Sequence, residues 1–541
     1  MTATLPDARS ADADADAEAG TEADARTPDR SRVVPPSLQP WVPTSRPLGW
    51  LLLAVVVVVA AFTRFWALGF PSTKSFDEIY YATEAQELLR YGYEDNRTYM
   101  FIVHPPLGKW FIAAGSALFG DNSWGWRVAP ALAGVACVVI VARLARRVFR
   151  SEVLGAVAGL LLALDGVTLV QSRVALLDIF LELFVLAGAA ALVVDRDWLR
   201  ARLAEFVLAG VDLTDTAPGV GPRPWRLVAG ACFGAAVAVK WSALSFWVGF
   251  ALLSLWWDRN AFKAAGVRSA WLTTLRRSVG GAAGSLLAAP VITYAFAWTG
   301  WFAGENSWNR HAEDGKWYGA IEALAKYHQQ AYSFHENLDS FHPYKSNPWS
   351  WWITGRPVTY YYEQNGVTGC GPTGTTCARE ILLIGTPLMW WAFVPAVVWL
   401  FWVGATRRDW RAGLVFVAVL AGWAVWLRYP DRTMFLFYMA PLVPFLVLAL
   451  TMALGAVLGP ALPEGRRRHL DRSDAGDEPG PDGEDDPWLA ARRRRRAVGA
   501  GLAAGYLGLV VVDFVWMWPL FTGGLLTYDQ WHAHMWFPSW V

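Results

Sequence analysis

The chain has 541 residues, of which 55% are hydrophobic and 17% are charged, and its formal net charge is +1. Because 47 basic residues are balanced by 46 acidic ones, the composition gives no indication of a nucleic-acid partner. Long apolar runs alternate with short charged clusters, whereas a soluble domain spreads its charge over the whole surface. We therefore expect an all-α, polytopic integral membrane protein.

Residues 1–46 are rich in Ala, Asp, Arg, Pro and Ser, and we expect them to form a disordered tail because they cannot bury a core. The first apolar run begins near Gly49 and is long enough for a full span, so it is not read as a signal peptide. A helix needs about 20 apolar residues to cross a bilayer. About eleven spans are expected on that length: 49–68, 125–143, 152–170, 177–194, 226–241, 243–257, 279–298, 382–403, 412–427, 434–457 and 498–518.

The expected orientation follows from Lys and Arg in the short connections, which favour the cytoplasmic side. With eleven spans and a cytoplasmic N-terminus, the main arginine clusters all fall on that side. These clusters lie at 143–150, 196–202, 268–277, 407–411 and 492–496. The protein is therefore expected in the cell membrane, with its C-terminus outside.

The predicted organisation has three parts after the tail. Residues 47–457 form a transmembrane unit with two large outer loops, 69–124 and 299–381. Residues 458–497 are acidic and then Arg-rich, which predicts a disordered cytoplasmic loop. Residues 498–541 hold the last span and the external C-terminus.

Two adjacent carboxylates, Asp77 and Glu78, follow the first span closely, next to Phe76, Tyr80 and Tyr81. A carboxylate held near an apolar boundary can have a pKa suited to base chemistry. Solvated loop acids are common, however, and both groups could instead cap the short helix that follows. Both interpretations stay open at this point.

Outer basic side chains form a second set of candidates. The prolines of His104-Pro-Pro-Leu-Gly-Lys109 hold His104 and Lys109 in a fixed frame, or else form a rigid corner with an interfacial Lys. Arg173 lies outside, against the positive-inside trend, and is either a phosphate-binding group or the ion-pair partner of Asp178. Lys240 ends an apolar run, where a lysine charge without a partner costs much free energy. It is therefore either a functional residue or part of an ordinary interfacial pair.

Histidine and aromatic residues are dense in the loop 299–381. His335, His342, Tyr344 and Trp349 belong to this set, whose composition suits carbohydrate or peptide binding. Because the sequence has no HExxH motif and no Cys/His ligand pattern, we expect no metal site.

Two cysteines, Cys370 and Cys377, flank a Gly/Pro turn in the same loop. Outside the cytoplasm such a pair favours a disulfide, and two free thiols are the alternative.

Taken together, these segments resemble the protein O-mannosyltransferase family, in a bacterial form of actinobacterial type without the soluble MIR domain of eukaryotic members. The resemblance covers nearly the whole chain from about Gly49. It is carried by Asp77-Glu78, His104-Pro-Pro-Leu-Gly-Lys109, Arg173 to Asp178, Lys240-Trp241, His342-Pro-Tyr to Trp349, Pro387-Leu-Met-Trp-Trp391, Phe437-Tyr-Met-Ala-Pro-Leu-Val-Pro444 and Met535-Trp-Phe-Pro-Ser-Trp540.

The resemblance implies a GT-C-type membrane glycosyltransferase that moves mannose, with inversion, from a polyprenyl-phosphate mannose to Ser or Thr. The expected acceptors are Ser/Thr-rich secreted or membrane proteins, including proteins leaving by Sec export, and no further cofactor is expected. Asp77 is then the general base. Because adjacent residues do not share a face of a helix or strand, Glu78 points elsewhere and is expected to position the acceptor or the loop rather than to act as a second base. The expected phosphate-binding residues are Arg173, Lys240, His104, Lys109 and Arg428, and the expected acceptor-binding residues are His335, His342, Tyr344 and Trp349.

Two other functions remain compatible with the sequence. One is a related GT-C enzyme that glycosylates a lipid or cell-wall polymer, and the other is a transporter or flippase. The long outer loops rich in His and Trp, together with the external acids, argue against transport.

Overall fold

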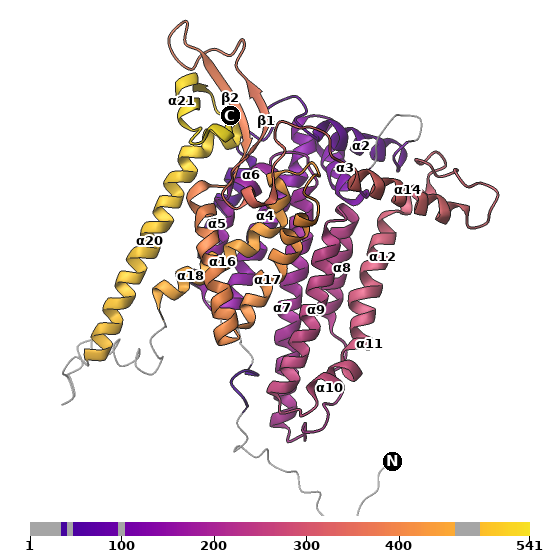
Figure 1. Cartoon of the computed structure of the whole chain (residues 1–541), viewed down its shortest axis with the longest axis vertical. Helices are drawn as coiled ribbons and strands as arrows, with labels where there is room; N and C mark the ends of the chain where they lie inside the picture. Colours follow the sequence, from indigo (N-terminus) through magenta and orange to yellow (C-terminus); the bar gives the residue numbers. More distant parts are fainter. Residues whose placement is uncertain (1–33, 40–46, 96–102, 460–486) are drawn as a thin grey trace, which may run out of the picture.

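Most of the chain is helical in the computed structural model, which describes residues 34–39, 47–95, 103–459 and 487–541. Long helices stand side by side, and shorter helices and a small sheet gather at one end of them (Figure 1). The longer elements are α1 (Pro47–Phe65), α4 (Ser123–Phe149), α5 (Glu152–Ala163), α7 (Asp178–Leu208), α8 (Pro224–Val239), α9 (Ala243–Ala264), α16 (Pro387–Arg407), α17 (Trp410–Gly422), α18 (Val443–Leu458) and α20 (Pro487–Thr522). The run 279–297 is continuous through α11 (Val279–Ala282), the π-helical η1 (Ala283–Ala288) and α12 (Ala289–Ala297).

The remaining elements are short or lie outside the long helices. They are α2 (Glu78–Tyr91), α3 (Leu107–Phe119), α6 (Gly166–Gln171), α10 (Ala270–Arg277), α13 (Thr299–Ala303), α14 (Gly319–Glu336), α15 (Pro348–Trp351), α21 (Tyr528–Ala533), the 3-10 helices η2 (Ala424–Arg428), η3 (Leu436–Leu442) and η4 (Pro538–Trp540), and the strands β1 (Val358–Glu363), β2 (Cys377–Leu383) and β3 (Leu526–Thr527).

Each expected span overlaps one or more helices. Seven helical segments of the described chain are long and apolar enough to cross a membrane: 47–65, 123–149, 279–297, 387–407, 410–428, 436–458 and 490–522. The other four expected spans correspond to α5 with α6, α7, α8 and α9, which are shorter or more polar. Helix α7 lies at the centre, packed against α4, α8 and α9.

Two expected spans differ from the structure in their boundaries. The run 152–170 is broken after Ala163, because the buried Asp165 starts a new helix by accepting a hydrogen bond from the Thr168 amide at 2.7 Å. The run 382–403 begins as the end of a strand, and its helix starts only at Pro387. Pro387 fits there because the first turn of a helix leaves its amide unbonded.

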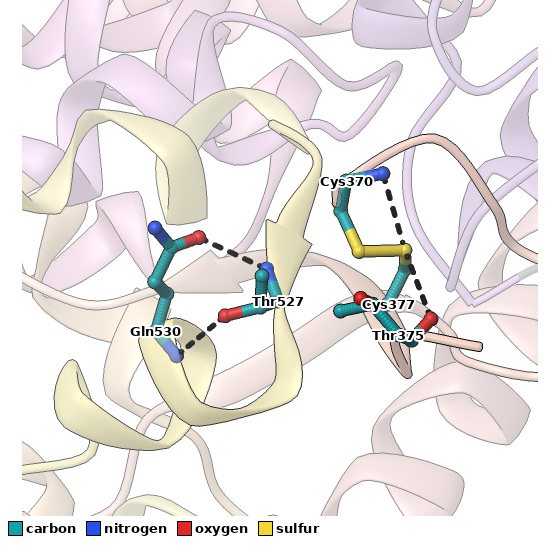
Figure 2. Close-up of a disulfide and its surroundings, with 5 residues drawn as sticks. All are labelled: Cys370, Thr375, Cys377, Thr527 and Gln530. Atoms are coloured by element: carbon teal, nitrogen blue, oxygen red, sulfur yellow. Dashed lines mark hydrogen bonds between the residues drawn. A yellow bond between two sulfur atoms is a disulfide. The ribbon is translucent and has the colours of Figure 1, made fainter. Parts of the chain in front are cut away.

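A three-stranded antiparallel sheet in the order β1–β2–β3 was not expected from the sequence. It joins the loop 299–381 to the C-terminal segment, because Cys377 of β2 pairs with Thr527 of β3. A disulfide links Cys377 to Cys370, the pairing favoured by their spacing, beside the capping box of Thr527 and Gln530 that starts α21 (Figure 2).

The helices α2, α3 and α14, the sheet and the C-terminus all lie at the same end of the molecule, and α10 lies at the other (Figure 1). This arrangement agrees with the placement of both large loops and the C-terminus on one side of a membrane. Which side is cytoplasmic remains a prediction.

Parts of the two segments expected to be disordered are ordered. Residues 487–497 begin the helix α20, because Ala and Arg are strong helix formers. In the expected tail, Leu38 is fully buried against Leu203 and Phe262. The rest of that tail and residues 460–486 lie outside the described residues.

Candidate active site

A cavity of about 540 Å³ lies at the end of the molecule that carries α2 and α14. Its wall is built from α2, α7, α9, α14, α17, η2 and η3, and its volume is in the usual range for small-molecule sites. Five of the residues singled out in the sequence line it: Asp77, His104, Lys109, Lys240 and His335.

The position of Asp77 is fixed by its neighbour Phe76. Phe76 has a left-handed backbone (φ 51°), and its ring stacks on Tyr360 at 4.9 Å and meets Phe435 and Phe437 edge-on at 5.9 Å. This aromatic contact ends the connection from α1 and starts α2, with Asp77 as the residue before the first helical turn. A short polar side chain is thereby held at the apolar edge of the cavity.

The Asp77 carboxylate does not cap α2, although it occupies the capping position. No hydrogen bond or ion pair engages it among the residues that the structure describes. Burial raises its pKa to about 6, with Lys240 lowering the pKa and Asp178 raising it to smaller extents. The helix-capping interpretation of this side chain is therefore wrong, and a carboxylate with a raised pKa is left on the cavity wall.

Glu78 points away from the cavity and is fully buried. Both of its oxygens accept hydrogen bonds from Arg127 at 2.7 Å, and it also accepts from the amides of Ser75 (2.9 Å) and Ala175 (2.7 Å). Glu78 thus joins the Asp77 loop to α4 and to the segment after α6. This geometry is consistent with the supporting role expected for it.

Two of the cavity's cations are neutralised by acids. Lys240 is the residue with extended backbone that follows α8, and its Nζ lies 2.7 Å from Oδ2 of Asp178. Lys109 lies 2.8 Å from Glu84 and 2.5 Å from Glu94. All five groups are at most 8% exposed, so each ion pair is held in a poorly hydrated wall.

Arg432 is the cavity cation that sequence reasoning missed. Its guanidinium donates to the carbonyls of His335 (2.9 Å) and Thr433 (3.2 Å) and to the Tyr438 hydroxyl (2.9 Å). In the described part of the chain no carboxylate forms an ion pair with it, so its positive charge is available to an anion. The signal in the sequence was the motif Arg428-Tyr-Pro-Asp-Arg432, from which Arg428 was chosen.

Two imidazoles, of His104 and His335, stack at 5.0 Å on the cavity wall. His335 donates through Nε2 to the Val103 carbonyl (2.9 Å), and burial lowers its pKa to about 4. Burial also lowers the pKa of His104 well below its usual value, helped by the charge of Lys240. Both rings are therefore neutral near pH 7, and His104 adds no positive charge.

The other candidates do not lie on the cavity. Arg173 donates to the carbonyls that end α1, those of Thr63, Arg64, Trp66 and Ala67, and so it neither pairs with Asp178 nor faces the cavity. Arg428 is exposed outside it. His342 packs on Phe435 at 4.9 Å, Tyr344 lies beneath Arg356 at 5.6 Å, and Trp349 is 64% exposed against Trp423. None of these side chains lines the cavity. Arg173 is held by the end of α1, and the rings of His342, Tyr344 and Trp349 pack on neighbouring side chains.

As far as the described residues go, the cavity thus offers one carboxylate without a partner, one guanidinium without a counter-charge and a largely apolar wall. A carboxylate can take a proton from a hydroxyl, and a guanidinium can hold a phosphate. Among the described residues, no group of three His, Cys, Asp or Glu side chains is arranged to hold a metal ion.

Comparison with known proteins finds relatives over nearly the whole chain. The family models for dolichyl-phosphate-mannose-protein mannosyltransferase and for the C-terminal four-span region of protein O-mannosyltransferase match residues 103–214 and 320–540. A polyprenol-phosphate-mannose–protein mannosyltransferase of Mycolicibacterium smegmatis is 38% identical over 96% of this chain and 100% of its own length. The protein of the same description from Corynebacterium glutamicum is 34% identical over 91% and 93%.

The fold is shared with a solved structure of the same kind. The Saccharomyces cerevisiae protein O-mannosyltransferase complex bound to its sugar donor superposes with a TM-score of 0.68 at 14% identity. The match covers 92% of this chain and 93% of that one, so the fold is of GT-C type, as expected.

Proposed function

The chain belongs to the protein O-mannosyltransferase family of membrane glycosyltransferases, and we propose that it transfers mannose from polyprenyl-phosphate mannose to Ser and Thr hydroxyls of proteins. In this reaction the hydroxyl oxygen forms a bond to the anomeric carbon, the bond from that carbon to the phosphate oxygen breaks, and the phosphate leaves with the electron pair. Asp77 accepts the hydroxyl proton. One displacement inverts the anomeric configuration.

The observation that carries the proposal is that no residue of the described chain forms a hydrogen bond or ion pair with the Asp77 carboxylate. Four carboxylates line the cavity in the described chain. Asp178 and Glu84 are held by lysines, and Glu336 is exposed at the end of α14. A half-buried carboxylate that faces the cavity and is free to accept a proton is what a general base requires. One available carboxylate also favours a single displacement over a route through a second nucleophile.

Arg432 and Lys240 are the groups that we assign to the donor phosphate. Arg432 presents a fixed guanidinium without a counter-charge, and Lys240 presents a charge shared with Asp178. Preorganised cations stabilise the charge that builds up on a leaving phosphate. Of the residues first expected in this role, Lys109 is held by two acids, and Arg173 and Arg428 lie off the cavity.

The rest of the wall suits the lipid part of the donor. Part of the wall is apolar, and the guanidinium of Arg432 lies 5.5 Å from the ring of Trp426 in it. The other apolar residues include Leu244 and Phe246 of α9, Val425 of η2 and Pro441 of η3. An isoprenoid chain gains about 0.8 kcal/mol for each CH₂ that it buries. The acceptor is proposed to enter from the outer side, past His335 and the aromatic loop that carries Trp349. Exported Ser/Thr-rich proteins fit this position.

The test is direct transfer. Purified protein is given radiolabelled polyprenyl-phosphate mannose with a Ser/Thr-rich peptide, with the same peptide in which every Ser and Thr is Ala, or with membrane lipid alone. Label in the first peptide only, released by an α-mannosidase, is expected. Label in the lipid fraction without the peptide would instead establish a lipid or polymer glycosyltransferase, and donor movement without transfer would establish a flippase.

A further inference from the structure

A hydrogen-bond chain beside the cavity joins three elements that are far apart in the sequence. The Trp241 indole, in the connection from α8 to α9, donates to the Tyr294 hydroxyl of α12 at 3.0 Å. The Tyr294 oxygen lies 2.6 Å from Nε2 of His328 on α14, and Nδ1 of His328 lies 2.7 Å from the Leu324 carbonyl. The proposed reaction uses none of these three side chains.

The partners fix the proton on each nitrogen. A carbonyl oxygen only accepts, so Nδ1 of His328 carries a hydrogen and donates it to Leu324. In a neutral ring Nε2 is then an acceptor, and the Tyr294 hydroxyl donates to it while accepting from Trp241. Every polar hydrogen in the chain is used when His328 is neutral. A proton on Nε2 would face the Tyr294 oxygen as a second donor and leave the hydroxyl hydrogen without an acceptor.

The surroundings of His328 also oppose a charge. Its ring stacks on Trp241 at 5.4 Å and contacts Trp298 at 4.9 Å. The titratable groups that face it are the hydroxyl-bearing rings of Tyr294 from α12 and Tyr327 from α14, and no ion pair engages it in the described chain. Burial lowers its pKa from the usual value.

The hydrogen-bond chain matters for the cavity because α14 and Trp241 both supply side chains to the cavity wall. The C-terminal half of α14 supplies Tyr332, Phe334, His335 and Glu336 to the cavity wall, and Trp241 lines it directly after Lys240. Nearer its end, α14 is tied down by the contact of His335 with Val103 and by Arg432. His328 lies two turns before His335, so it fixes the middle of the helix.

We infer that the Trp241–Tyr294–His328 chain positions α14 over the cavity and that this docking requires neutral His328. Protonation of His328 then releases the helix and widens the entrance, which makes these residues positioning groups with a pH-dependent effect. The inference rests on the proposed function only for its kinetic readout.

The first arm of the test measures docking without catalysis. Ala323 is fully buried on α14, against Trp298 and Tyr327, so a Cys placed there reports undocking by its reaction with a membrane-impermeant maleimide. The Tyr294→Phe change removes the central hydroxyl and should raise the labelling rate of Ala323→Cys about tenfold at pH 7.5. Tyr327→Phe is the matched control, because its buried hydroxyl has no hydrogen-bond partner among the residues that the structure describes, and its loss should leave the rate unchanged.

The second arm varies pH, corrected for the reactivity of a free thiol. Labelling of Ala323→Cys should rise several-fold between pH 7.5 and 5, and His328→Gln, which cannot be charged, should remove this dependence. Equal labelling in the Tyr294→Phe and Tyr327→Phe proteins, or an unchanged pH dependence in His328→Gln, would overturn the inference. In transfer assays Tyr294→Phe should raise KM about tenfold and leave kcat within about twofold. If none of the proteins transferred mannose, the proposed function would fail while the labelling result would stand.

Discussion

Replacement of Asp77 by Asn is the most informative single change, because it removes the charge and keeps the size of the side chain. Loss of a general base typically lowers the rate about 10²–10⁴-fold. The structure predicts that the carboxylate has no other task, since no partner holds it in the described chain. Donor binding should therefore remain while transfer is lost.

The same change should stabilise the protein. Burial raises the Asp77 pKa from 3.8 to about 6. At pH 7 the carboxylate is therefore charged in both states, and its charge has a higher free energy in the folded state than in the unfolded state. Two pKa units correspond to about 3 kcal/mol, and the partial exposure of Asp77 to the cavity reduces this to about 1–2 kcal/mol. This penalty is present above about pH 6 and disappears as pH falls towards 4, so the advantage of the variant should shrink in acid.

Two measurements on the same detergent preparation check this reasoning. Transfer of radiolabelled mannose gives the rate, and thermal unfolding of parent and variant at pH 7.5 and pH 5 gives the stability. Glu336→Gln, a change at an exposed carboxylate of the same cavity, is the matched control and should keep transfer near the parent level. Asp77→Asn protein that transfers within tenfold of the parent, or that is less stable at pH 7.5, would refute the base assignment.

Three further outcomes are expected. Arg432→Gln should weaken donor binding about 100-fold, since it removes a half-buried charge on the cavity wall, whereas Arg428→Gln should change donor binding little because Arg428 lies outside the cavity; equal effects in a titration with donor would contradict the assignment. Replacing Cys370 and Cys377 by Ser should cost about 2.5 kcal/mol or less, because the loop that they close is short, and should leave transfer intact; denaturation and transfer assays check both. Cys in place of the 94%-exposed Trp317 should react with an impermeant maleimide in intact cells, and reaction only after permeabilisation would reverse the orientation.

The apolar runs predicted the bundle well because a membrane-spanning helix satisfies its own backbone, so its signal is local. The misplaced boundaries have a physical cause. Residues 381–384 are as apolar as the helix that follows, but they belong to β2 and its end, where pairing with β1 uses their backbone groups. Strand pairing depends on a partner elsewhere in the chain, and no local pattern reports it. The break at Asp165 also depends on a tertiary contact, since Trp390 donates to its side chain.

For the cavity, the sequence indicated which charges are functional candidates but not where they point. Lys240 was found because a Lys at the end of an apolar run is expensive without a partner. Asp77 was found as one of two adjacent carboxylates that follow the first span among aromatic residues, and His335 was found because histidines and aromatics are dense in the loop 299–381. Arg173 and Arg432 have the same local appearance, an external arginine near a span. One donates to the last carbonyls of α1 and the other faces the cavity. Only the packing of helices decides between these two uses of a guanidinium.

Lys240 also links donor binding to the strength of the base. Its charge lowers the pKa of Asp77, in opposition to burial and to Asp178. A donor phosphate placed beside Lys240 would compensate that charge and add a negative one, so the Asp77 pKa should rise above about 6 when donor is bound. The acid limb of kcat reports the loaded enzyme, and that of kcat/KM for the donor reports the free enzyme. The acid limb of kcat should therefore lie about one pH unit above the acid limb of kcat/KM. This difference between the two limbs should disappear in Lys240→Met. Coincident limbs in the parent protein would show that the phosphate binds away from Lys240.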